Sequence, residues 1–307
     1  MHRYGVTWDA RSDDGGESML TLVTVCFNNP EELEKTVASV SLQTVQPDDY
    51  VIVDSSDSDI SPRMKRIAEN APARYVWVPP EGVYQAMRHS VTLVDDESWV
   101  WWINSSDWLA GKKSIEIVTD AISEVDASPD IHWIVGELLR LANPIPSVHP
   151  VGSTGKDFLQ MLQTGKTGFP HPSTVFRKKS LVTVAPYEDR FAIASDYATA
   201  LRFDKAFGPP LLLTSSLAVH DPTGLTSRYP AKNLWERSRA RIATGSALDA
   251  VSELWRLPRS VIRGVLTRLI GEKPVQRDGN RRDHFPLRGN EPFDSESEAG
   301  RSLNFTP

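Results

Sequence analysis

Between residues 19 and 136, two kinds of hydrophobic pattern alternate along the chain. Short runs of consecutive apolar and β-branched residues predict strands that are buried on both faces. Between them, apolar residues recur every three to four positions, which predicts helices. The predicted strands are residues 20–27, 50–54, 74–78, 99–103 and 131–136, and the predicted helices are residues 30–42, 61–70, 83–94 and 112–124. This alternation indicates βαβ units, and therefore an α/β fold with a mostly parallel central sheet flanked by helices.

After residue 136 the pattern is less regular, and residues 137–170 show no clear periodicity. Later strands are predicted at 173–177 and 211–219, and later helices at 195–206, 231–257 and 259–270. Polar and charged residues dominate both ends of the chain, which is typical of disorder. The expected organisation is a flexible lead at 1–18, a main domain at 19–228, C-terminal helices at 229–272 and a disordered tail at 273–307.

The composition of the chain is that of a soluble globular protein. Of its 307 residues, 40% are hydrophobic and 24% are charged, and the formal net charge is -6. A mildly acidic chain lacks the overall charge of a nucleic-acid-binding protein. The single cysteine, Cys26, excludes an internal disulfide and a cysteine-rich zinc site. Since neither a signal peptide nor a long apolar stretch is recognised, we expect a cytoplasmic protein, free or at the inner face of the membrane.

Polar residues follow three of the predicted strands at the point where each strand ends. These residues are Asn28, Asp54 and Asp107. In an open parallel sheet, ligands bind beyond the carboxyl ends of the strands, so the three side chains are expected to line one rim. They suit a polyhydroxylated or phosphorylated ligand together with a hard cation. Neither G-x-G-x-x-G nor the P-loop motif occurs, which disfavours the two commonest nucleotide-binding folds of this class.

Several segments, taken in order, resemble glycosyltransferase family 2. Residues 22–29 (LVTVCFNN) are similar to the opening of the family, and residues 51–59 (VIVDSSDSD) to its second-strand motif. Residues 82–87 (GVYQAM) resemble the G-I-Y-D-A-M segment of its bacterial cell-envelope polysaccharide branch. Segments that resemble the metal-binding motif and two later motifs are 102–107 (WINSSD), 171–177 (HPSTVFR) and 194–197 (ASDY). The likeness covers roughly residues 19–228, and the order of the motifs is more specific than any one of them.

This resemblance implies a GT-A fold with C-terminal helices appended, and inverting transfer of a sugar from a nucleotide-diphosphate-sugar donor. The acceptor is expected to be a hydroxyl of a saccharide or of a lipid-linked molecule, in the assembly of a cell-surface polysaccharide or glycolipid. Asp107 would hold Mg²⁺ or Mn²⁺, and Asp196 would be the general base that deprotonates the acceptor. The residues expected to bind the donor are Cys26, Phe27, Asn28, Asp54 and Tyr84.

Three positions depart from the pattern of that family. Pro80 and Gln85 stand where acidic residues are usual, and Ala198 replaces another acidic residue. These departures leave open a catalytically inactive relative that binds a sugar nucleotide or a partner enzyme. A nucleotidyltransferase is a further alternative, but residues 27–30 lack the Gly-rich, basic first loop typical of that class.

Each candidate carboxylate also has a purely structural interpretation. Asp54 suits a solvated turn after a strand, and Asp107 and Asp196 suit caps of the helices that follow them. Cys26 and Met87 suit positions in the core. The tryptophans of the predicted strand 99–103 are likewise expected in the core rather than stacked on a sugar.

Two histidines and one basic segment have uncertain roles at the level of sequence. His171 and His220 could line a cleft, but isolated histidines are usually packed or solvated, so we do not expect them to bind metal. In residues 256–270, arginines alternate with aliphatic residues. This pattern fits either a helix on an anionic membrane surface or a helix packed on the main domain.

Overall fold

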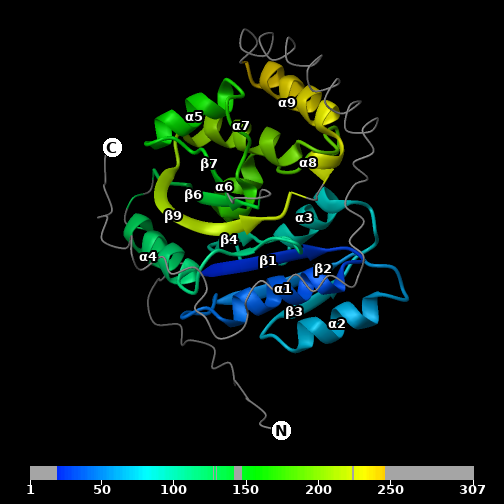
Figure 1. Cartoon of the computed structure of the whole chain (residues 1–307). Coiled ribbons are helices and arrows are strands. Elements are labelled where there is room, and N and C mark those ends of the chain that lie inside the picture. The colour runs from blue at the N-terminus through cyan, green and yellow to red at the C-terminus, as the bar shows by residue number, and fades with distance from the viewer. Residues whose placement is uncertain (1–18, 127, 129, 142–146, 223–224, 246–307) are drawn as a thin grey trace.

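The computed structural model describes residues 19–126, 128, 130–141, 147–222 and 225–245. Its strands form one curled sheet with helices on both faces (Figure 1). In spatial order the strands are β3 (Arg74–Trp77), β2 (Asp49–Asp54), β1 (Leu20–Cys26), β4 (Trp99–Trp102), β8 (Thr174–Arg177), β6 (Trp133–Arg140), β9 (Leu211–His220) and β5 (Trp108–Leu109), and β7 (Ser147–His149) pairs with β6.

The half of the sheet from β3 to β4 is parallel, as the alternating pattern predicts. All seven residues of β1 are buried because strands flank it on both sides and helices cover both faces. The first crossover helix begins at Pro30, a residue whose fixed φ suits a first helical position, and Glu31 and Glu32 face the positive end of its dipole. The helices that connect these strands are α1 (Pro30–Ser41), α2 (Ser61–Glu69) and α3 (Val83–Val91).

The other half of the sheet mixes strand directions. Strand β8 is antiparallel to both β4 and β6, whereas β6 and β9 are parallel. The long β9 curves across the molecule in Figure 1, and its end pairs antiparallel with the short β5. The α/β fold with helices on both faces of the sheet is therefore confirmed, with a sheet that is parallel in its first half and mixed in its second.

Two apolar cores lie on opposite faces of the sheet. One contains residues of α1, α2 and α4 (Ser114–Asp126). The other contains residues of α3, α5 (Gly155–Gln163), α6 (Lys178–Thr183), α7 (Ser195–Phe207) and α9 (Pro230–Thr244). Trp99, Trp101 and Trp102 are completely buried, and Met87 of α3 is only 2% exposed within its core. The expectation that these residues belong to the core is confirmed.

Several short elements in the second half were not predicted. They are β5, β7, α5, α6, the 3₁₀ turn η1 (His171–Ser173) and α8 (Leu225–Arg228). The predicted helix 231–257 is confirmed as α9 up to Thr244, where α9 ends, so the helix is not continuous over that range. Gly245 follows with a φ of 100°, a left-handed conformation that terminates a helix and that glycine adopts without strain. Residues 246–257 of the prediction lie outside the described residues.

Some predictions concern residues outside those that the structure describes. These are the flexible lead at 1–18, the basic helix at 256–270 and the tail at 273–307. Over the described ranges, no helix is long and apolar enough to cross a membrane.

Candidate active site

Two loops at the carboxyl ends of β1 and β2 are tied together by Asn28. Its backbone N–H donates to Ser56 Oγ at 2.8 Å, and its side-chain amide donates to Asp57 Oδ2 at 2.7 Å. The amide oxygen in turn accepts the backbone N–H of Asp57 at 3.0 Å. Asn28 has a φ of 52°, a left-handed conformation that Asn tolerates better than most residues. The predicted site residue Asn28 thus shapes the rim, and its partner Asp57 is a rim residue that the sequence analysis did not single out.

Asp54 lies beneath this rim rather than on it. Its side chain is 0% exposed, so the interpretation as a solvated turn is wrong. Oδ2 accepts the hydroxyl of Tyr75 at 2.6 Å, and Oδ1 accepts the backbone N–H of Ser56 at 2.8 Å. The Cys26 thiol lies 3.7 Å from Oδ1. Burial, followed by the charge of Asp54, raises the pKa of Cys26 well above its ordinary value, so this thiol stays protonated.

Two aromatic side chains are exposed beside these loops. Phe27, directly after β1, is 52% exposed, and Trp77, at the end of β3, is 49% exposed. The Trp77 indole donates to the carbonyl oxygen of Ser56 at 2.9 Å, which fixes the ring beside the rim loop. Exposed large aromatic rings next to backbone polar groups suit stacking with a planar ligand. The sequence analysis predicted Phe27 as a binding residue and treated Trp77 only as part of a strand.

Asp107 lies in the turn between β4 and β5 and forms a pair with His220. The carboxylate is almost fully buried, and its Oδ1 lies 2.7 Å from His220 Nδ1. Burial lowers the pKa of His220, but the hydrogen bond and the charge of Asp107 outweigh that effect and raise it overall. The next helix begins only at Ser114, so the interpretation of Asp107 as a helix cap is wrong.

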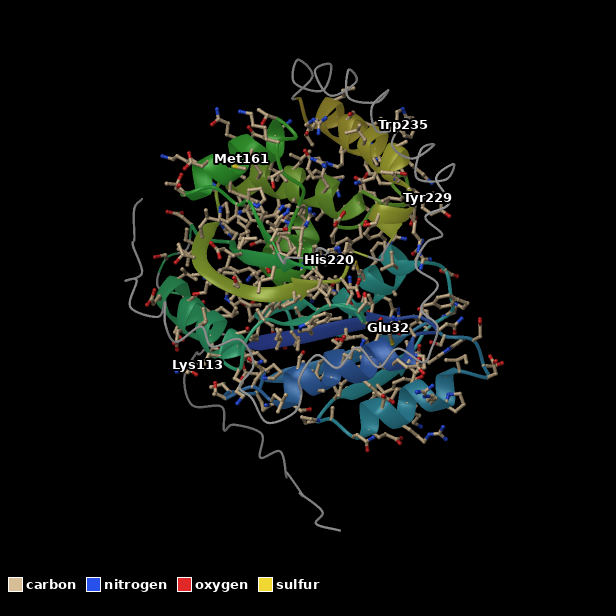
Figure 2. All side chains as sticks on the ribbon, in the orientation of Figure 1. Glu32, Lys113, Met161, His220, Tyr229 and Trp235 are labelled. Atoms are coloured by element: carbon tan, nitrogen blue, oxygen red, sulfur yellow. The ribbon has the colours of Figure 1, made fainter. Side chains whose placement is uncertain are left out.

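The long β9 explains how these two residues meet. Trp108 and Leu109 of β5 pair antiparallel with Val219 and Ala218 of β9, which places the ends of both strands together. In the view of Figure 2, His220 lies near the middle of the molecule, above Glu32 of α1 and below Tyr229, which precedes α9. The sequence analysis expected a packed or solvated histidine at 220 and missed its pairing, because only the sheet brings residues 107 and 220 together.

The Asp107–His220 pair has the chemistry of a partial site for a divalent cation. Carboxylate and imidazole are both common ligands of such ions. The Asn104 side-chain oxygen of the same turn is buried and has no hydrogen-bond partner in the described part of the chain. Among the described residues, no group of three or more His, Cys, Asp or Glu side chains could hold a metal. The residues present therefore fit an ion that takes most of its ligands from a bound phosphate and from water.

Asp196 and Tyr84, both predicted site residues, are brought together by α7 and α3. Tyr84 Oη lies 3.1 Å from Asp196 Oδ1 and 2.6 Å from the carbonyl oxygen of Ile193, to which it donates. Burial raises the pKa of Asp196 to about 6, although Tyr197 N–H and Tyr84 favour its ionised form. Asp196 is in the first turn of α7, whose N-cap is Ala194 and makes no side-chain cap hydrogen bond, so the cap interpretation is wrong here too.

The loop before Asp196 is held by a buried carboxylate from α9. Glu236 is 2% exposed. Its oxygens accept the backbone N–H groups of Ala192 at 3.2 Å, Ile193 at 2.8 Å and Ala194 at 3.0 Å. Three consecutive backbone donors on one carboxylate make a rigid support for the start of α7. The sequence analysis missed Glu236, because a Glu in an amphipathic helix is usually a surface residue.

His171 belongs to an aromatic cluster behind Tyr84. Its Nε2 lies 3.0 Å from Tyr187 Oη, and the Tyr187 ring stacks with that of Tyr84 at a centroid distance of 6.0 Å. Burial lowers the pKa of His171 to about 3, which keeps the imidazole neutral. His171 is therefore packed in the core, as the sequence analysis expects.

The sequence of the chain matches one protein family over more than half of its length. Residues 21–182 match the model of glycosyl transferase family 2. The chain belongs to this family. An uncharacterized glycosyltransferase of Mycobacterium tuberculosis, Rv1514c, is 24% identical over 215 residues, which cover 68% of this chain and 77% of the relative.

Solved glycosyltransferase structures share the fold at low sequence identity. The mannosyltransferase PcManGT from Pyrobaculum calidifontis, in complex with GDP-Man and Mn²⁺, matches with a TM-score of 0.55 and 14% identity, over 88% of this chain and 81% of that one. Glucosyl-3-phosphoglycerate synthase from Mycobacterium tuberculosis, with Mn²⁺, UDP and glucosyl-3-phosphoglycerate, matches at 0.51 and 15%, over 80% and 84%. The chain spans 39% of S. aureus TarS, with a TM-score of 0.54 and 11% identity over 72% of this chain.

The family match ends before three of the groups described above. Asp196, His220 and Glu236 all follow residue 182, the last residue that the family 2 model matches. The family assignment therefore rests on the first part of the chain, whereas the pairing of Asp107 with His220 and the support of Asp196 are properties of this fold as the structure describes it.

Proposed function

We propose that this member of glycosyl transferase family 2 is an active, metal-dependent inverting hexosyltransferase. It moves a sugar from a nucleotide-diphosphate-sugar donor to a hydroxyl of a saccharide or lipid-linked acceptor, in the assembly of a cell-surface polysaccharide or glycolipid. The observation that carries the proposal is the environment of Asp196, a largely buried carboxylate with a pKa of about 6 that is held at the start of α7.

Asp196 is proposed as the general base. A base with a pKa close to neutral is ionised at physiological pH, yet it still has the basicity needed to accept a proton from an acceptor hydroxyl. Glu236 fixes the loop that precedes Asp196, and Tyr84 bridges that loop and the carboxylate. The acceptor oxygen, once deprotonated, attacks the anomeric carbon from the side opposite the leaving nucleoside diphosphate, which inverts the configuration.

Asp107 and His220 are proposed to hold Mg²⁺ or Mn²⁺. When bound, such an ion supplies electrostatic stabilisation of the negative charge on a diphosphate leaving group. Two fold neighbours, PcManGT and glucosyl-3-phosphoglycerate synthase, were solved with Mn²⁺, which supports the assignment. The burial of Asp107 and its hydrogen bond to His220 keep the carboxylate in a single orientation before any ligand binds.

The predicted donor residues have two different roles in this proposal. Phe27 and Asn28, at the rim, contact the nucleotide. Asp54 and Cys26 lie beneath the rim, and Asp54 acts by holding the backbone of Ser56. Tyr84 remains a proposed donor residue and also contacts Asp196.

An inactive relative is the second candidate, and a specific contact bears on it. Gln85, at a position where the family usually has an acidic residue, donates to Asp189 Oδ1 at 2.7 Å, and Arg88 donates to the same oxygen at 2.6 Å. The position is thus occupied by a neutral side chain that is tied to an exposed carboxylate. Loss of a sugar or acceptor contact at Gln85 would leave a protein that binds a sugar nucleotide without turnover.

Calorimetric titration with UDP-, GDP- and dTDP-sugars, with and without Mn²⁺, tests the proposal. Metal-dependent binding followed by slow hydrolysis of the donor supports the enzyme, whereas binding without hydrolysis or transfer supports the inactive relative. Asp196→Asn is expected to abolish turnover and to preserve donor affinity. Asp204→Asn is the matched control on the same helix, and it should retain activity. Normal turnover in Asp196→Asn would remove Asp196 from its role.

A further inference from the structure

Four basic side chains from separate elements gather beside the candidate active site. They are Arg140 at the end of β6, His149 of β7, His220 at the end of β9 and Arg237 of α9. The proposed function assigns a role to His220 alone. The other three residues form what we call the basic cluster.

Residues 167–168 bring the basic cluster together. Arg237 donates from Nη2 to the carbonyl oxygen of Thr167 at 2.6 Å, and Thr167 Oγ1 lies 2.8 Å from His149 Nε2. A Cβ atom placed on Gly168 would lie 3.5 Å from His149 Cε1 and 3.9 Å from Arg140 Nη2. Arg140, His149 and Arg237 therefore approach one short segment of backbone from three different elements.

The basic cluster lies beside both carboxylates of the proposed active site. Arg140 is the register partner of His220 in the β6–β9 pair, and His220 is bonded to Asp107. On the other side, Arg237 Cζ lies 4.7 Å from the centroid of the Tyr197 ring, which belongs to the residue after Asp196. An acceptor whose hydroxyl reaches Asp196 is therefore bound close to these guanidinium groups.

Arg140 and Arg237 repel each other at this place. Burial and the charge of Arg237 both lower the pKa of Arg140. No residue in the part of the chain that the structure describes forms an ion pair with Arg140. Asp107 and Asp221 act on the charge of His220, and Arg237 acts on that of Asp196. No carboxylate among the described residues counters the repulsion on Arg140 in the same way. A bound anion would relieve this repulsion.

We propose that Arg140 binds an oxyanion of the acceptor, a phosphate or a carboxylate close to the hydroxyl that receives the sugar. Arg237, which also donates to the carbonyl oxygen of Gly165 at 3.2 Å, adds positive charge beside it. A guanidinium presents paired N–H donors whose geometry matches either oxyanion. This inference rests on the proposed function and adds the class of acceptor, an anionic saccharide or a lipid-linked saccharide phosphate. His149, which is neutral because burial lowers its pKa to about 4, positions Thr167 and Gly168 rather than adding charge.

The diphosphate of the donor is a second source of the same chemistry, so the experiment must distinguish the two. Inorganic phosphate and malonate are titrated separately into the full chain by calorimetry, in the presence of Mg²⁺. Each titration is repeated with a saturating concentration of whichever of UDP, GDP or dTDP binds. An acceptor subsite keeps its affinity for the small anion when the nucleotide is present, because the nucleotide occupies a different place.

Arg140→Gln is expected to weaken binding of the preferred anion about tenfold, and Arg140→Lys to weaken it less, because the charge remains and the paired donors are lost. Arg66→Gln, an exposed arginine of α2, is the control for the loss of one positive charge and should match the wild type. Thermal unfolding of each variant shows whether it is folded, and Arg140→Lys provides the test if Arg140→Gln is not.

Three outcomes would overturn the inference. They are displacement of the anion by the nucleotide, equal affinities in the Arg140→Gln and Arg66→Gln variants, and no binding of either anion. A preference for phosphate identifies a phosphorylated acceptor, and a preference for malonate identifies an acidic sugar. Failure of the proposed function is recognised separately, because then no nucleotide sugar binds or turns over, whereas the titrations with small anions still report on the basic cluster.

Discussion

At the scale of single residues, the carboxylate of Asp196 is largely removed from solvent at the start of α7. Burial raises its pKa to about 6, and the hydrogen bond from Tyr197 N–H opposes that shift. The same burial has two measurable consequences, one for the rate of transfer and one for stability.

The rate of sugar transfer is expected to depend on pH through Asp196. Because the base must be ionised, kcat/KM should rise tenfold per pH unit below about pH 6 and become constant above it. Steady-state kinetics between pH 4.5 and 8.5 would measure this dependence of kcat/KM on pH. The assignment of the base would be contradicted if kcat/KM did not fall below about pH 6. It would also be contradicted if the residual activity of Asp196→Asn fell in the same way.

The stability of the protein is expected to increase when Asp196 is replaced by Asn. The folded-state pKa of about 6 exceeds the ordinary value of 3.8, so between these two values the folded chain binds more protons than the unfolded chain. Stability therefore falls as pH rises through this window, by about 3 kcal/mol at most. Asp196→Asn should raise the Tm at pH 7.5, and the gain should vanish below about pH 4. The exposed Asp120→Asn is the control, and an equal effect there would refute the argument.

At the scale of elements, α9 supports α7 through one buried side chain. Glu236→Gln replaces a carboxylate oxygen by an NH₂ group, which cannot accept the N–H groups of the 192–194 loop. We expect a loss of about 1 to 3 kcal/mol of unfolding free energy, because buried donors are left without a partner. We also expect kcat to fall more than donor affinity. Glu124→Gln, on the exposed side of α4, should change neither, and an unchanged kcat in Glu236→Gln would exclude a positioning role.

The start of α5 packs tightly against the residues that lead into β9. Adding one methyl group at Gly155 tests how tight this packing is. A Cβ on Gly155 would lie 2.3 Å from the backbone oxygen of Pro210, a contact that only movement of the backbone can relieve. Gly155→Ala should therefore destabilise the protein by about 1 to 3 kcal/mol in chemical denaturation. Gly168→Ala meets its nearest neighbour at 3.5 Å and serves as the control. Equal midpoints for the two variants would show that this contact is not tight.

The sequence predicted the elements of the first half because each carries its own local signal. Strand β1 is a continuous apolar run, and α1 begins at a proline after two asparagines. The short β5 and β7 have too few residues to show a period, and α5 lies in a segment without clear alternation. The directions of β8, β6 and β9 depend on contacts between residues far apart in the chain, which no local pattern contains.

The candidate site shows the same division. Asn28 lies at the rim where the end of a strand predicted it, and the contact between Tyr84 and Asp196 agrees with a shared site. The partner of Asp107 was not predictable, because His220 is brought to it only by the pairing of β5 with β9. Glu236 was missed for a related reason, since burial of a carboxylate follows from tertiary packing and not from helical periodicity.

At the scale of the whole molecule, the two faces of the sheet carry different parts of the candidate site. The face that carries α1 and α2 adjoins the loop held by Asn28, and the face that carries α3, α7 and α9 holds Asp196 and Glu236. The proposed cation ligands Asp107 and His220 come from strands in the second half of the sheet. Under the proposed function, donor and acceptor would be held largely by separate sets of elements, and Tyr84 of α3 would be shared by both. Acceptor specificity could then vary while the rim residues stay unchanged.

Because β9 and α9 come late in the chain, the candidate site can form only after most of the chain has been synthesised. During synthesis, the ribosome releases β1 to β4 and their helices first, and that portion already has its central strands. Asp107 can pair with His220 only after another 113 residues have been synthesised. The loop that precedes Asp196 is held only once Glu236 of α9 has been synthesised. A nascent or proteolysed fragment that stops before β9 would therefore contain Asp107 and Asp196 but lack His220 and Glu236, which hold them in place. If the proposed function is right, such a fragment is inactive.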